Sequence, residues 1–505
     1  MYLRKMFQQS SHYFLGHALS IFAGLISFPI YTRLFSASEY GLLSIISTTV
    51  FFVMAFAKFG IQNSFIRFFD EIKNNKKSVT LLNYYSTLFF GPVITVAGIS
   101  LLYLVTVLFL NGRLIEEKAV VYFAMSAVWT FFLCSNILIK SFLRAEQNTL
   151  MYNVVSIFSK YCSLVLGIIL VYSFFKSLFG LYLAFIITEA LIFIFLAVRL
   201  HTKYKVNIKH FNKTLFLECL SYGFPLVGME LTSIILNAGD RYVLLYFLGT
   251  AAVGIYSAGY DLAMHAMEGL IIPLSFVIMP IYMRIWTERG EKETSEFLSK
   301  CLKYFLLVAL PCILGFNYLS KDLTILLASR KFENAYKIAP YVSSGVLFYG
   351  LTNIFNAGLF IKKRTALLTF WTVAAGALNV ILNILFVPAW GVIGAAAATL
   401  IAYFLLFLIL SISAFRYLSF KIEYTAIFKY FVFSALMIYF IGLFKIEGLL
   451  ANIIIKGVSG VICYLVLLYV FDKDIKNLLG KYISKLGGQS ESSSFIKSHN
   501  NHPEK

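Results

Sequence analysis

Apolar stretches long enough to cross a bilayer recur along nearly the whole chain, and only short polar segments separate them. A hydrocarbon core about 30 Å thick requires roughly 20 apolar residues per helix. Of the 505 residues, 60% are hydrophobic and only 13% are charged, and the mean hydropathy is +0.81. A water-soluble domain of this length could not bury so much apolar surface. The chain is therefore predicted to be an all-α integral membrane protein.

The apolar stretches predict about fourteen transmembrane helices when they are read with a window of about 19 residues. Each span has to be helical, because backbone polar groups in lipid must be satisfied within the segment. The seventh and eighth spans are divided at the hinge Leu248-Gly249-Thr250. The predicted spans are 12–34, 41–66, 80–109, 119–141, 151–174, 179–198, 217–247, 252–283, 301–319, 336–361, 367–387, 392–414, 425–444 and 450–471.

Lysine and arginine residues are concentrated in every second loop between the predicted spans. Such a bias sets the orientation of a polytopic protein in the membrane. With the N-terminus inside, most of the 43 basic residues fall on the cytoplasmic side, so both termini are predicted to be cytoplasmic. The net charge of +19 is thus a topology signal. Nucleic acid is not an expected partner, because the charges are dispersed among helices and do not form one basic domain. Examples are Lys73, Lys76 and Lys77; Arg199, Lys203, Lys205, Lys209 and Lys213; and Lys362, Lys363 and Arg364.

Two pairs of hinge glycines indicate an internal repeat. Gly41 and Gly254 are separated by about 213 residues, and Gly180 and Gly394 by nearly the same offset, which is the length of six helices with loops. Because six is even, both halves enter the membrane from the same side and form parallel repeats. Two such lobes would enclose a central cavity that opens alternately to each side of the membrane.

The repeat predicts a division of the chain into four parts. Residues 1–214 form an N-terminal six-helix lobe, and residues 215–424 form a C-terminal six-helix lobe. Residues 425–471 form an additional transmembrane helix pair outside the duplication. Residues 472–505 form a polar cytoplasmic tail, which is predicted to be disordered.

Short motifs at the hinges resemble the Wzx-type polysaccharide flippase family, whose superfamily also contains the lipid II flippase MurJ and the MATE exporters. The matching segments are PIYTRL at 29–34 with EYG at 39–41, YGFPLV at 222–227, NAGDR at 237–241, VGIYS at 253–257, and Asn379 and Asn383 followed by PAWGVIGAA at 388–396. They spread over about the first 400 residues. The resemblance implies a protein of the bacterial cytoplasmic (inner) membrane that moves an undecaprenyl-diphosphate-linked oligosaccharide from the inner to the outer leaflet, as in O-antigen or capsule export. It also implies a cationic central cavity.

Charged side chains at bilayer depth are functional candidates, because each costs about 2.5–3.5 kcal/mol to insert. A sugar-linked diphosphate needs cations, and the planar arginine fork meets phosphate oxygens bidentately. The predicted substrate-binding residues are Arg33, Lys58, Lys160 and Arg241. Two alternatives are open: Arg33 can snorkel to the interface, and Lys160 can pair structurally with Glu189.

Acidic residues and one histidine lie in the seventh and eighth spans, and they are predicted to couple an ion or to position the arginines. Asp261 and His265 are four residues apart, and Glu268 follows three residues later, so the three can share one helix face. Arg241 can instead form a structural pair with Glu230 or Asp261. Spans one, two, seven and eight are expected to line the cavity. The predicted ion-coupling or arginine-positioning residues are Glu230, Asp240, Asp261, His265 and Glu268.

Partners and competing functions follow from the same residues. Expected partners are the lipid-linked glycan, membrane lipids, a glycan polymerase or glycosyltransferases, and a coupling cation, Na⁺ or H⁺. No phosphate-binding loop and no C-x-x-C spacing occur, so neither ATP hydrolysis nor a metal site or cofactor is expected. The alternative function is a cation-coupled MATE-type small-molecule exporter. An enzyme is not expected, because the longest outer loop, 320–335, contains no paired acid–base motif.

Overall fold

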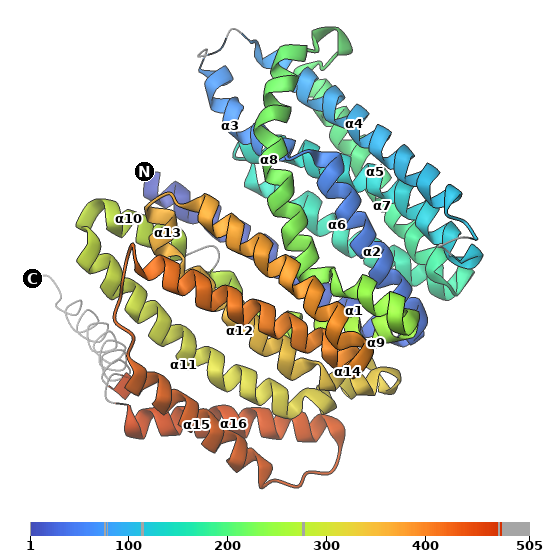
Figure 1. The fold of residues 1–505 in the computed structure, drawn as a ribbon. Helices are drawn as coiled ribbons and strands as arrows, with labels where there is room; N and C mark the ends of the chain where they lie inside the picture. Colours follow the sequence, from blue (N-terminus) through green and yellow to red (C-terminus); the bar gives the residue numbers. More distant parts are fainter. Residues whose placement is uncertain are drawn as a thin grey trace, which may run out of the picture. The chain divides into compact units, whose positions relative to one another are not determined.

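The computed structural model describes residues 2–74, 77, 79–112, 116–274, 278–472 and 475–476, with the side chains of 2–15, 17, 272 and 273 left aside. The predicted tail lies almost wholly outside these residues. The described chain is almost entirely helical (Figure 1). The helices are α1 (Tyr2–Leu34), α2 (Ala37–Lys58), α3 (Ile61–Lys73), α4 (Leu81–Phe109), α5 (Glu117–Ala145), α6 (Thr149–Leu170), α7 (Leu178–Tyr204), α8 (Lys213–Ala238), α9 (Asp240–Pro273), α10 (Met279–Arg289), α11 (Glu291–Leu323), α12 (Ala339–Phe355), α13 (Ala357–Ile361), α14 (Thr365–Phe415), α15 (Tyr424–Gly442) and α16 (Leu449–Phe471).

The predicted all-α membrane fold is confirmed. In the described part of the chain, 11 helices are long and apolar enough to cross a membrane, and the stretch Ala18–Leu34 of α1 is a shorter apolar helix. Two of the long helices reverse direction at a glycine with positive φ, Gly249 (φ 79°) in α9 and Gly391 (φ 60°) in α14. Glycine adopts this conformation without steric cost. The turn in α14 therefore separates the predicted spans 367–387 and 392–414, whereas the turn in α9 separates the predicted span 252–283 from the end of the span 217–247, most of which lies in α8.

The second predicted span, 41–66, departs from expectation because it breaks between α2 and α3. Phe59 and Gly60 both have positive φ, 45° and 67°. At this break the chain lies against α8: a Cβ added to Gly60 would sit 2.1 Å from the carbonyl oxygen of Gly223. The Ser64 hydroxyl donates to the Cys219 carbonyl at 2.9 Å. Close backbone approach, rather than helix propensity, ends α2 here.

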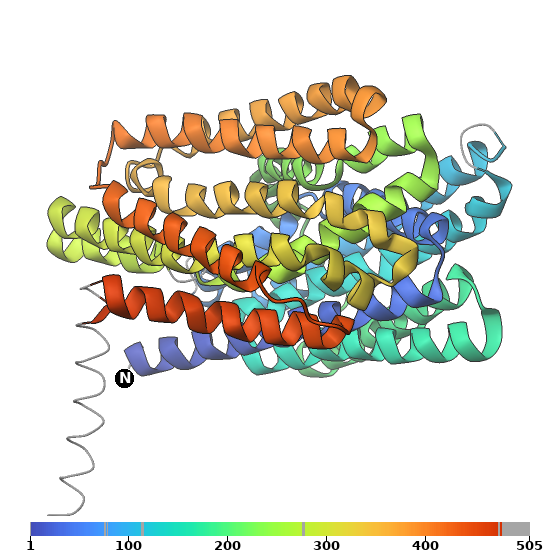
Figure 2. The same cartoon turned by 90° about the horizontal axis from the view of Figure 1, so that it is seen from below.

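The helices group into two compact units. Residues 1–280 and 327–419 form the first unit, and residues 281–326 and 420–505 form the second. In the second unit, α15 and α16, the two red helices of Figure 2, pack against each other and against α11. Lys429 Nζ donates to Asp472 at 3.0 Å, and Lys303 Nζ lies 2.9 Å from Glu423. The predicted lobe boundaries, after residues 214 and 424, stay a prediction.

The closest helix contact in the first unit joins α2 to α9 at the two hinge glycines of the predicted repeat. A Cβ on Gly41 would lie 1.9 Å from the Thr250 carbonyl oxygen, and a Cβ on Gly254 would lie 1.8 Å from the Ala37 carbonyl oxygen. The two contacts are reciprocal, because Ala37 and Thr250 are themselves repeat equivalents. Such reciprocity is the mark of an isologous contact across a two-fold axis.

Hydroxyl groups on both helices meet on either side of these glycines. The Ser44 and Ser257 hydroxyls lie 2.7 Å apart and are separated by 213 residues in sequence. The Ser38 and Thr250 hydroxyls lie 2.6 Å apart and are separated by 212 residues. Ser44 thus meets its own repeat equivalent, and Ser38 meets the residue one position before its equivalent, which supports the internal repeat with evidence independent of the hinge sequences.

A carboxylate clamp joins the ends of α4, α5 and α7. Glu146 accepts hydrogen bonds from Tyr85 at 2.6 Å, from Lys203 at 2.9 Å and from the Tyr204 hydroxyl. The rings of Tyr85 and Tyr204 stack with centroids 3.6 Å apart. Burial by itself raises the pKa of Glu146, but the hydrogen bonds from Lys203, Tyr204 and Tyr85 outweigh it, so the pKa lies below its ordinary value near 4.5.

We expect Glu146→Gln to lower the thermal stability of the purified protein at neutral pH. The loss is expected to be about 1–3 kcal/mol, because three donors lose a charged acceptor. A depressed carboxyl pKa stabilises the fold above the unfolded value near 4.5, and this contribution is lost as pH falls through the lower folded value. Melting curves of wild type and variant are therefore expected to converge in acid. Glu117→Gln, at the exposed start of α5, is the control; equal melting temperatures for wild type and Glu146→Gln at pH 7 would contradict the clamp.

Candidate functional site

A pocket of about 370 Å³ lies in the first unit where spans one, two, seven and eight meet. This volume is at the lower end of the roughly 300–1,000 Å³ range of ligand sites. Side chains with hydroxyl or amide groups predominate in the lining, with aliphatic and aromatic groups between them. The lining residues are Tyr31, Tyr40, Leu43, Ser44, Ser47, Thr48, Phe51, Ser233, Ile234, Asn237, Ala238, Arg241 and Asp261.

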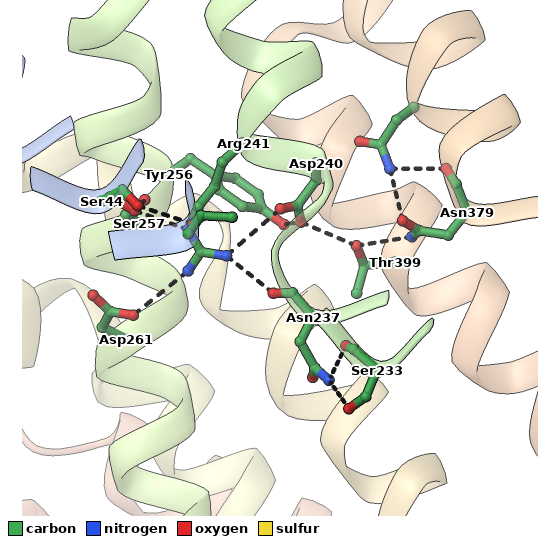
Figure 3. A network of polar contacts seen from close by, with 12 residues as sticks. Ser44, Ser233, Asn237, Asp240, Arg241, Tyr256, Ser257, Asp261, Asn379 and Thr399 are labelled. Atoms are coloured by element: carbon green, nitrogen blue, oxygen red, sulfur yellow. Dashed lines mark hydrogen bonds and ion pairs between the residues drawn. The ribbon is translucent and has the colours of Figure 1, made fainter. Parts of the chain in front are cut away.

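Arg241 occupies the centre of a polar network at this pocket (Figure 3). Its side chain is buried, with 7% of the residue exposed. Nε donates to the Ser44 hydroxyl at 2.8 Å, and Nη1 donates to the Asn237 carbonyl at 3.0 Å. Nη1 also lies 3.7 Å from Asp240 Oδ1, and Nη2 lies 3.7 Å from Asp261 Oδ1. Because Arg241 is in the first turn of α9, its side chain reaches both the preceding helix end and α2.

Asp240 is the buried end of this network, with 1% exposure. Its Oδ2 accepts from the Tyr256 hydroxyl and, at 3.4 Å, from the Thr399 hydroxyl. Asn379 donates to Thr399 at 3.2 Å, and Asn383 donates to the Asn379 carbonyl at 2.8 Å. Oδ1 of Asp240 accepts no hydrogen bond from the described residues. A chain of polar groups therefore runs from Arg241 into α14.

Asp261 is the acidic group of the pocket wall. Its side chain is 35% exposed, and Oδ2 accepts from the Tyr40 hydroxyl at 2.7 Å. The two charged residues of the lining, Arg241 and Asp261, have opposite signs. This pocket is therefore charge-balanced, which differs from the expected cationic cavity. The reason is that the other predicted cations lie outside the lining.

The other three candidate cations contact protein groups elsewhere. Lys58 is buried at the end of α2 and pairs with Glu230 on α8. The Arg33 guanidinium is exposed and donates to the carbonyls of Pro29 at 2.9 Å and Leu327 at 3.0 Å.

Lys160 is exposed on α6 and donates to the Ser20 carbonyl at 3.5 Å. The alternative pairing of Lys160 with Glu189 is not found, because Glu189 accepts from Asn136 and Ser159.

His265 and Glu268 form a pair on α9, with Nδ1 and Oε2 3.5 Å apart. The imidazole packs against α1: a Cβ on Gly24 would lie 2.9 Å from His265 Cε1, and the Phe28 ring meets the imidazole edge to face. Neither residue lines the pocket. Of the three acidic and histidine candidates predicted on one face of span eight, only Asp261 lines it.

Sequence reasoning identified Arg241, Asp240 and Asp261 but missed their uncharged partners. Hydroxyl residues such as Tyr40 and Thr399 occur throughout apolar spans, so nothing marks them individually. The signal for the α14 partners is the pair of asparagines, Asn379 and Asn383, in an otherwise apolar helix.

The structure resembles the lipid II flippase MurJ in an inward closed conformation, with a TM-score of 0.75 and 18% identity over 93% of this chain and 99% of that chain. It also resembles an inward-facing multidrug resistance MATE family transporter of the MOP superfamily, with a TM-score of 0.61 and 13% identity over 79% and 94%. At these identities the likeness concerns the fold.

Two sequence comparisons add to the structural ones. An uncharacterized membrane protein of Methanocaldococcus jannaschii is 25% identical over 198 residues, and the match spans 39% of each chain. The family model for polysaccharide biosynthesis proteins matches residues 7–286, more than half of the chain. The resemblance read from the hinge motifs is confirmed at the level of family and fold. The chain is a multi-pass membrane protein that belongs to the polysaccharide biosynthesis protein family.

Proposed function

We propose that this protein is a flippase of polysaccharide biosynthesis and not an enzyme. It moves an undecaprenyl-diphosphate-linked oligosaccharide from the inner to the outer leaflet of the bacterial cytoplasmic membrane, with both termini in the cytoplasm. The observation that carries the proposal is the buried Arg241 at a polar pocket between the two repeats, in a chain of this family. Membrane lipids and the glycosyltransferases or polymerase that make and use the glycan are its proposed partners.

Alternating access is supported by the contact between the repeats. The pocket of about 370 Å³ is too small for an oligosaccharide with a diphosphate, so it has to widen during transport. The α2–α9 contact at Gly41 and Gly254 lies next to residues of the pocket lining, and in the proposed cycle the two repeats separate at this contact when the pocket widens. Arg33, Lys58 and Lys160 remain proposed substrate contacts in the opened cavity.

We further propose that a coupling cation binds at Asp240. This carboxylate is buried, its Oδ1 accepts no hydrogen bond from the described residues, and the Thr399 hydroxyl of α14 lies 3.4 Å from its Oδ2. Such oxygens are the ligands that a hard cation prefers, and the same carboxylate could carry a proton. Asp240 also holds Arg241, and the two roles are compatible.

A cation-coupled exporter of the MATE type is the second candidate. The Asp261 carboxylate at the pocket favours it, because a charge-balanced wall accepts a cationic small molecule more readily than an all-cationic one would. The hydroxyl-rich lining and the family favour the flippase.

The test is the leaflet distribution of lipid-linked glycan in cells depleted of this protein. We expect the glycan to accumulate on the cytoplasmic face, wild type to restore its export, and Arg241→Ala to restore none. Arg289→Ala, an exposed arginine at the end of α10, is the matched control and is expected to restore export. An unchanged leaflet distribution after depletion would reject the flippase and favour the exporter.

A further inference from the structure

We propose that the pocket at Arg241 and Asp261 is a glycan subsite, which binds an uncharged sugar ring of the cargo, and that the carrier diphosphate lies outside it. This inference rests on the proposed function and assigns the chemistry of that site. It implies that the protein distinguishes a carrier loaded with glycan from the bare carrier.

The first observation is the charge of the wall. A diphosphate next to Arg241 would also lie next to the Asp261 carboxylate, whose Oδ1 is 3.7 Å from Arg241 Nη2. Like charges placed together in a partly desolvated site repel each other. No other charged side chain is in the lining to offset this repulsion. An uncharged ligand meets no such penalty.

The second observation is the spacing of that pair. A distance of 3.7 Å exceeds the 2.7–3.2 Å of an N–H···O hydrogen bond, so Arg241 Nη2 and Asp261 Oδ1 do not satisfy each other. Adjacent hydroxyls of a sugar can satisfy both: one oxygen accepts from the guanidinium, and the neighbouring hydroxyl donates to the carboxylate.

The third observation concerns two hydroxyl groups of the lining. Tyr31 is in α1 and Ser47 is in α2, and neither hydroxyl hydrogen-bonds to any other residue that the structure describes. Both side chains are half-buried. Each therefore offers a donor and an acceptor to a ligand, whereas the neighbouring Ser44 and Tyr40 hydroxyls are committed to Arg241 and Asp261.

A site of this kind discriminates strongly between a ligand that carries sugar hydroxyls and one that does not. A pocket built to hydrogen-bond hydroxyl groups rejects a ligand that lacks them by a large factor, because its polar groups are left unpaired. A volume of about 370 Å³ suits a single ring rather than the whole glycan. The protein would then engage the loaded carrier and leave the bare carrier to return by another route.

The experiment compares two ligands on the purified full-length protein in nanodiscs. One is lipid-linked glycan extracted from cells depleted of the protein, and the other is undecaprenyl diphosphate without sugar. Wild type is expected to bind the loaded carrier at least about tenfold more tightly. The double variant Tyr31→Phe with Ser47→Ala removes only hydroxyls without a described partner, so it is expected to fold normally. It is expected to lose about tenfold in affinity for the loaded carrier and none for the bare carrier.

Asp261→Asn is likewise expected to lose affinity for the loaded carrier and none for the bare carrier. Tyr246→Phe changes a residue that is 83% exposed, and it is the control. Equal losses for both ligands in the double variant, or tighter binding of the bare carrier by Asp261→Asn than by wild type, would overturn the subsite and assign the pocket to the diphosphate. Full affinity of the double variant for the loaded carrier would also overturn it. If wild type binds neither ligand, the proposed function itself fails, which is a distinct result.

Discussion

Joining α2 to α9 by a disulfide between Ser38→Cys and Thr250→Cys is expected to abolish transport, and reduction is expected to restore it. The two hydroxyl oxygens lie 2.6 Å apart across the contact between the repeats. That separation is compatible with the Cβ spacing of about 3.5–4.5 Å that disulfides require. Because the pocket has to widen to pass an oligosaccharide, a covalent link at this contact holds it in one state.

The measurement is flipping of a fluorescent lipid-linked glycan in proteoliposomes before and after oxidation. Both single-cysteine variants are expected to stay active under oxidation, which separates cross-linking from loss of a side chain. The six native cysteines, Cys134, Cys162, Cys219, Cys301, Cys312 and Cys463, are in other parts of the chain and are tested by oxidising wild type. Undiminished flipping by the fully cross-linked protein would show that the repeats do not separate here.

The helices were predictable from the sequence because lipid imposes one length and one backbone structure on each span. The turns inside α9 and α14 were also visible, since Gly249 and Gly391 are glycines between apolar runs. The break at Phe59 and Gly60 was not. It depends on the backbone of Gly223, some 160 residues away, and no local pattern encodes that contact.

The site was predictable only where a charge marks it. Arg241, Asp240 and Asp261 stand out because ionised groups are costly in a membrane. Their partners come from helices distant in sequence, and side-chain register between such helices cannot be read from either one alone. The pairing of Lys58 with Glu230 shows the same limit: both were candidates, but nothing in the sequence placed them together.

Neutralising Arg241 and Asp240 separately is expected to damage the protein more than neutralising both. Arg241→Gln leaves the Asp240 carboxylate buried beside Tyr256 and Thr399 without its cation. An unpaired charge of this kind costs about 3–5 kcal/mol. Replacing both members by uncharged residues of similar shape removes that cost. The double variant Arg241→Gln with Asp240→Asn is therefore expected to recover the melting temperature and yield of wild type.

Flipping by the double variant is expected to stay absent, because the guanidinium that faces the pocket is still missing. This combination, a restored fold without transport, separates a substrate-binding arginine from a structural one. A double variant that flips at the wild-type rate would assign Arg241 to structure alone. The single variant Asp240→Asn adds the coupling test: if a cation binds at Asp240, an imposed Na⁺ or proton gradient accelerates flipping by wild type and not by this variant. Equal acceleration of both would remove Asp240 from coupling and leave it the role of holding Arg241.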